Sequence, residues 1–163
     1  GDVNLFRYVS NNPLNLIDPL GLLELPGLEC FGFSDEIKKL ILDENGDFWK
    51  QVQEMIDAQQ SLIQKRETGF TVKKDGEISP ITTEPFRWLT GGGNLNNRPE
   101  PPNTGLGVHK HLTGSSSNPS NGDRNEAKSR GRPEMSVGKK DFSITNGRGT
   151  EKTYPLPKNI QSK

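Results

Sequence analysis

This 163-residue chain has one cysteine, two histidines and no long apolar run. The single cysteine, Cys30, excludes an intrachain disulfide and a zinc site built from several cysteines. No apolar run approaches the ~18 residues of a transmembrane helix, so the sequence predicts no membrane segment. The chain begins at Gly1 without an initiating Met. We therefore expect a fragment of a longer protein, in which a missing signal peptide says nothing about export.

Apolar residues are also few, and the net charge is zero. Hydrophobic residues make up 29% of the chain, which also has 18 Gly and 12 Pro, whereas ordinary globular domains have roughly 45–50% apolar residues. This composition predicts a small core with long loops or unstructured stretches. The balance of 21 basic and 21 acidic residues argues against a globally electrostatic nucleic-acid binder. Residues 124–163 nevertheless carry ten Lys/Arg against four Asp/Glu.

The N-terminal 22 residues contain the most specific motif of the sequence. A short β-type run is followed by two turn-forming segments, namely Asn4-Leu-Phe-Arg-Tyr-Val9, then Asn11-Asn-Pro13, then Asp18-Pro19-Leu20-Gly21. Together they resemble the end of an Rhs/YD-repeat core, the shell that precedes a variable C-terminal toxin. The resemblance implies an autoproteolysis motif, Asp18, Pro19, Gly21 and Leu22, with the cut near Leu22–Leu23. The partner aspartate lies upstream and is absent, so this chain alone is not expected to cleave.

The same resemblance implies the location in which the protein acts and its interaction partners. Residues 1–22 would be the end of the Rhs core, and the remainder would be the toxin. Its partners would be the Rhs shell from which it is released, a cognate immunity protein and a target in the attacked cell. The protein would be exported from the producing bacterium by contact-dependent or secretion-system delivery. It would act in the target-cell cytoplasm.

The variable region divides by composition into three parts. Residues 23–46 are expected to be a linker, broken by Pro26, Gly27 and Gly32, and a short helix that Ser34 caps. Residues 47–157 are expected to form the toxin domain, and residues 158–163 a disordered tail.

The toxin domain is expected to have an α+β fold. Asp47 is predicted to cap a core helix from Phe48 to about Arg66, because apolar residues recur there at three- and four-residue steps. A β-hairpin turning at Asp75-Gly76 follows. Other strand candidates are 86–89, 106–111, 135–137, 142–144 and 153–156, with Gly/Asn/Pro/Ser-rich loops over 91–103 and 114–122. These elements predict a small mixed β-sheet packed against a long helix.

His109 and His111, the only two histidines, lie one residue apart on the strand candidate 106–111. Residues i and i+2 of a strand face the same side, so both imidazoles point together, as binding to one metal ion requires. Ser120-Asn-Gly-Asp123 follows after eight residues. Asp123 supplies a carboxylate as third ligand, or it caps a short helix over 124–129.

Two imidazoles and a carboxylate suit zinc. A catalytic zinc site keeps three protein ligands and an open position for water, whose pKa falls toward ~7. A separate carboxylate then accepts the proton of the water, and a hydroxyl group stabilises the developing oxyanion. Glu67, at the start of the predicted hairpin, and Ser120 offer these two groups.

The pattern of an upstream Glu, His-x-His and Ser-x-x-Asp resembles the JAB/MPN (JAMM) metallopeptidase motif. The order of the expected elements agrees as well, and JAB-like domains are a known class of Rhs-type toxin tails. The resemblance implies zinc bound by His109, His111 and Asp123, with Glu67 as general base and acid and Ser120 assisting the oxyanion. It implies cleavage of peptide or isopeptide bonds, or deamidation, in a target-cell protein. Eight residues separate His111 from Ser120 where the family has seven.

Several alternatives stay open at this stage. Glu77 and Glu84 rival Glu67 as the general base, and Ser117 rivals Ser120. The chain could also be a metal-dependent nuclease, with His109 and His111 as base and metal ligand. Phosphates would then contact four basic residues, Arg130, Arg132, Lys139 and Lys140. No later His or Asn ligands of an HNH type follow, however, and nucleic acid is not the expected partner. A third reading is a toxin tail without enzymatic activity.

Overall fold

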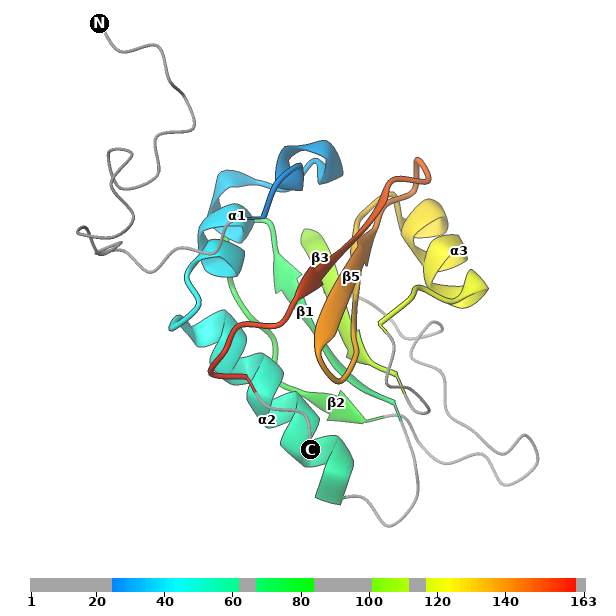
Figure 1. Cartoon of the computed structure of the whole chain (residues 1–163). Coiled ribbons are helices and arrows are strands. Elements are labelled where there is room, and N and C mark those ends of the chain that lie inside the picture. The colour runs from blue at the N-terminus through cyan, green and yellow to red at the C-terminus, as the bar shows by residue number, and fades with distance from the viewer. Residues whose placement is uncertain (1–24, 62–66, 84–100, 112–116, 161–163) are drawn as a thin grey trace, which may run out of the picture.

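The computed structural model describes residues 25–61, 67–83, 101–111 and 117–160 (Figure 1). The motif with Asp18, Pro19, Gly21 and Leu22 lies outside the described residues. The same holds for the strand candidate 86–89, for Glu84 and for residues 161–163. None of the helices in the described ranges combines the length and hydrophobicity that a membrane crossing needs.

A mixed six-stranded sheet forms the centre of the described part. Its strands are β1 (Thr68–Lys73), β2 (Thr82–Thr83), β3 (Thr104–Lys110), β4 (Glu134–Val137), β5 (Asp141–Thr145) and β6 (Glu151–Pro155). They lie in the order β2-β1-β3-β4-β5-β6, and only β3 and β4 pair in parallel. With the helices on its two faces, this sheet confirms the expected mixed α/β fold (Figure 1).

Within the described residues, three α-helices flank the sheet. Figure 1 shows α1 (Asp35–Leu42) and α2 (Asp47–Ser61) on one side and α3 (Asn121–Arg130) on the other. Ser34 caps α1 as expected, because its side chain accepts a hydrogen bond from the Ile37 backbone. Asp47 is the first residue of α2 and not its cap. The expected continuation of α2 to Arg66 lies outside the described residues.

The apolar core lies between α2 and one face of the sheet. The buried face of α2 carries Phe48, Trp49, Val52, Met55 and Ile56. Across from it, a row of paired strand residues, Phe70, Val108, Met135 and Ile144, covers the sheet. Side chains alternate along a strand, so the neighbouring residues of β3, His109 among them, point to the other face, beneath α3.

Residues 25–33 are not the linker that their Pro and Gly content predicts. A 3-10 helix, Leu28–Phe31, lies between two left-handed glycines, Gly27 and Gly32. Leu28, Phe31 and Phe33 are buried in the core. The glycines provide turns that direct these apolar side chains inward, so this segment belongs to the domain.

The first residues of the expected disordered tail also pack against the domain. Ile160 is buried, and the side chain of Asn159 donates a hydrogen bond to the Glu44 carbonyl at 2.9 Å. Asn159 and Ile160 thus contact the domain, although the sequence predicts a disordered tail from residue 158.

Candidate metal centre

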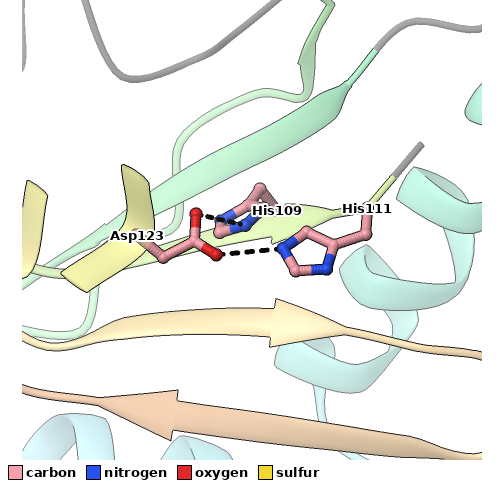
Figure 2. Close-up of side chains that lie close together, drawn as sticks. All are labelled: His109, His111 and Asp123. Atoms are coloured by element: carbon pink, nitrogen blue, oxygen red, sulfur yellow. Dashed lines mark hydrogen bonds and ion pairs between the residues drawn. The ribbon is translucent and has the colours of Figure 1, made fainter. Parts of the chain in front are cut away.

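His109 and His111 face a single carboxylate, that of Asp123 (Figure 2). The Nε2 atom of His109 lies 3.1 Å from Oδ1 of Asp123, and Nε2 of His111 lies 3.0 Å from Oδ2. The two imidazole rings are 5.0 Å apart between centroids. One potential ligand atom from each residue lies within 4.8 Å of the others, so the structure brings the three groups together.

The start of α3 fixes the position of Asp123. Ser120 is the N-cap residue, and Asp123 is the third residue of the helix. Each of the two side chains accepts a hydrogen bond from the backbone N–H of the other residue, which forms a capping box. Asp123 is therefore not the helix cap, the role that the sequence left open to it. Its carboxylate is instead held in place and aimed at β3.

The three groups could hold a metal ion. Tetrahedral zinc ligands at about 2.1 Å lie roughly 3.4 Å from one another, whereas here the imidazole nitrogens lie 3.1 and 3.0 Å from the two different oxygens of Asp123 and all three ligand atoms lie within 4.8 Å. Nε2 of His109 is buried and makes no well-aligned hydrogen bond within the described residues, although it forms an ion pair with Asp123 at 3.1 Å. A metal ion bound between the two groups would give this buried nitrogen a directed partner.

Burial makes the charges of this site interdependent. His109 and Asp123 are at most 6% exposed. Burial lowers the pKa of His109, but the carboxylates of Asp123 and Glu134 outweigh it and raise the pKa to about 10. Burial raises the pKa of Asp123, but its contacts with both histidines outweigh burial and hold the pKa well below its usual value. In the metal-free protein His109 therefore holds a proton at the place where a cation would bind.

Glu134 is a site residue that sequence reasoning missed. It is buried at the start of β4, and its Oε2 lies 3.8 Å from Nδ1 of His109. The other carboxylate oxygen pairs with buried Arg132. Gly107 makes room for this pair, because a Cβ there would collide with both side chains. The only signal in the sequence was an Arg-x-Glu spacing before an apolar run, which is common on surfaces.

Glu67 directly precedes the first residue of β1. Thr68 pairs with Lys110, so continuing the antiparallel register by one residue places Glu67 opposite His111, on the same face of the sheet. Glu67 is half-buried and is not one of the three clustered ligands. Its rival Glu77 is exposed and paired with Lys73 at the far end of β1. Lys73 lies roughly 17 Å from Thr68, the first residue of β1, at ~3.3 Å per strand residue.

Ser117, the rival of Ser120, has a different environment. It is buried, and its hydroxyl lies 2.9 Å from that of Ser143. Ser120 is exposed and adjoins the carboxylate of Asp123. With eight residues between His111 and Ser120, Ser120 still adjoins the cluster through Asp123.

The sequence matches no family model, and neither the curated proteins nor the solved structures yield a match to the chain. The geometry of the cluster and the motifs in the sequence are therefore the features that bear on function.

Proposed function

We propose that this protein is a zinc-dependent hydrolase that cleaves peptide or isopeptide bonds, or deamidates, in a target-cell protein. One observation carries the proposal, namely the convergence of one potential ligand atom each from His109, His111 and Asp123 within 4.8 Å of one another. Two neutral imidazoles and one carboxylate are the donors that catalytic zinc sites use, with one position left open for water.

Each residue has a role that its position supports. Bound zinc would supply a water with a pKa lowered toward ~7. Glu67, opposite His111 in register, would accept the proton of that water and pass it to the leaving amine. Ser120 accepts a hydrogen bond through Oγ from the Asp123 backbone, so its own hydroxyl proton is available to a substrate carbonyl oxygen.

The JAB/MPN fold and the Rhs context belong to this proposal. The Ser120–Asp123 cap and the antiparallel pairing of β1, which Glu67 directly precedes, with the strand that carries His109 support the JAB/MPN assignment. The motif within residues 4–22 supports release from an Rhs shell, with export, an immunity protein and action in the target-cell cytoplasm as its consequences.

The nuclease alternative loses two of its four phosphate-binding residues. Arg130 pairs with Glu126, and Arg132 pairs with buried Glu134, so both cations already have carboxylate partners. A non-enzymatic tail does not explain why the chain buries His109 together with the carboxylates of Asp123 and Glu134, since buried charges are costly.

The test combines metal content with toxicity. Purified protein should contain about one zinc per chain by elemental analysis, and His109→Ala/His111→Ala protein should contain none. Glu67→Gln should keep the zinc and lose toxicity in expressing cells. Glu77→Gln is the matched control and should behave as wild type.

Two outcomes would count against the proposal. Stoichiometric zinc in folded His109→Ala/His111→Ala protein would exclude the assigned site. Full toxicity of the zinc-retaining Glu67→Gln variant would exclude Glu67 as the base. Comparing new protein termini in cells that express wild type with those that express Glu67→Gln would identify the substrate, while degraded nucleic acid would favour a nuclease.

A further inference from the structure

A cleft of about 830 Å³ opens at the end of the sheet where β3 begins. Residues 29–34 form one wall, and residues 131–133 and 146–148 form another. Lys74, Gly105 and Lys128 complete the lining. The cleft contains none of the three clustered ligands, so it is a separate feature from the metal centre.

The charge of this cleft differs from that of the whole chain. Four cations line it, Lys74, Lys128, Arg132 and Arg148, against one carboxylate, Glu29. Lys74, Lys128 and Arg148 are exposed, and none of the three forms an ion pair within the described ranges. The chain as a whole has 21 charges of each sign. Because Arg132 is paired with Glu134, the three exposed cations exceed Glu29 by two charges. This positive excess is local, and a cleft concentrates its effect on a ligand.

Helix α3 connects the cleft to the metal centre. Asp123 lies in its first turn, and Lys128, five residues later, lines the cleft, which corresponds to about 8 Å at 1.5 Å per helical residue. Arg132 lines the cleft and also pairs with Glu134, the neighbour of His109. An extended peptide advances ~3.3 Å per residue, so two or three residues would cover the distance.

We propose that this cleft binds an acidic segment of the protein substrate, two or three residues from the bond that is cleaved. That the bound segment belongs to a substrate rests on the proposed function, whereas the preference for an acidic peptide rests on the cleft alone. Single-stranded nucleic acid fits less well, because such sites stack bases on exposed aromatic rings. The two aromatic residues of the lining, Phe31 and Phe33, are buried in the core.

The experiment measures binding of a dye-labelled peptide of alternating Glu and Gly to the full chain by fluorescence anisotropy. Chelator is present throughout, so that no metal contributes. Wild type should bind this peptide, bind a Lys/Gly peptide much more weakly, and lose affinity as salt is added. Lys74→Glu/Lys128→Glu should weaken binding by about tenfold or more, equivalent to ~1.4 kcal/mol. Both side chains are exposed, so the fold should tolerate the change.

The matched control is Lys139→Glu/Lys140→Glu, which makes the same charge change at two exposed lysines between β4 and β5. It should alter affinity by no more than about twofold, since these lysines do not line the cleft. Equal loss in both double variants would overturn the proposal, as would tighter binding of a single-stranded oligonucleotide of the same charge. Because no zinc is present, failure here leaves the hydrolase proposal standing, and peptide binding by a protein that takes up no zinc would reject only the hydrolase.

Discussion

The backbone N–H of Ser120 donates a hydrogen bond of 2.6 Å to the same Asp123 oxygen, Oδ2, that lies 3.0 Å from Nε2 of His111. The residue that begins α3 therefore also orients the candidate ligand. The cap and the site share one carboxylate, so a change to the cap should affect metal binding as well as helix stability.

Ser120→Ala should lower the free energy of unfolding by about 1 kcal/mol, the usual value of a serine cap. It removes the oxygen that accepts from the Asp123 backbone, so the first turn of α3 loosens and zinc affinity also falls. Urea denaturation with chelator and a zinc titration measure the two effects. The control is Ser129→Ala, an exposed serine of the same helix. Similar losses in both variants would contradict a special role for the cap.

Glu134→Gln should weaken zinc binding by about 10–100-fold, the usual effect of losing a carboxylate behind a histidine ligand. The amide keeps an oxygen that can accept from Arg132, so the fold should survive, but it loses the charge that faces Nδ1 of His109. A competition titration against a chromophoric chelator measures the affinity. Glu151→Gln, which alters a carboxylate paired with Arg124, is the control. Unchanged zinc affinity in Glu134→Gln would show that the carboxylate does not orient the imidazole.

Stability of the metal-free protein should depend on pH through His109 and Asp123. The folded-state pKa of His109 is raised to about 10, so its stabilisation is complete below its unfolded value near 6.5 and is lost as pH rises toward 10. The pKa of Asp123 is lowered, so its stabilisation is complete above about 3.8 and is lost as pH falls. The free energy of unfolding should therefore be highest between about pH 4 and 6.5.

Urea denaturation with chelator at pH 5, 6.5, 8 and 9 tests the alkaline limb. Wild type should lose on the order of a few kcal/mol over this range, at 1.36 kcal/mol per pKa unit. Lys110 changes the free energy of unfolding in the opposite direction. Burial lowers its pKa in the folded protein, so the folded state gains stability as pH rises. His109→Gln isolates the histidine and should flatten the decline. An equal decline in that variant would assign it to other groups.

Gly107→Ala should destabilise the protein by roughly 1–3 kcal/mol, the usual cost of overpacking. The new methyl group would collide with Nη1 of Arg132 and with the carboxylate of Glu134. Because this carboxylate also faces His109, the variant should lose zinc affinity in addition to stability. Thermal denaturation and a zinc titration check both. A destabilised variant with wild-type zinc affinity would separate the buried ion pair from the site.

The local features of the site could be predicted from the sequence because their causes are local. Strand alternation places His109 and His111 on one face, and the Ser-x-x-Asp spacing places Ser120 and Asp123 at a helix start. The strands expected over 135–137, 142–144 and 153–156 overlap β4, β5 and β6 for the same reason. The spacing could not decide which of the two residues caps the helix, since Ser120 and Asp123 are both good capping residues.

Features that depend on strand pairing were beyond sequence reasoning. Glu134 approaches His109 only because β4 pairs in parallel with β3, and nothing in either strand specifies this partner. The cleft depends on segments that lie more than 100 residues apart in the chain, 29–34 and 146–148. Residues 25–33 were misjudged because their prolines and glycines suggested a linker, whereas the left-handed turns at Gly27 and Gly32 allow Phe31 and Phe33 to reach the core.

The candidate ligands are close together in the chain as well as in space. Only 12 positions separate His111 from Asp123, and both belong to the β3–α3 unit. Closing a loop of this size is fast and has a small entropic cost compared with pairing β1 or β6 to the rest of the sheet. A cation captured by this unit would therefore stabilise one corner of the chain before the distant strands have assembled. If the chain is delivered into another cell and folds there, as the proposed function implies, the metal would be an early participant in folding.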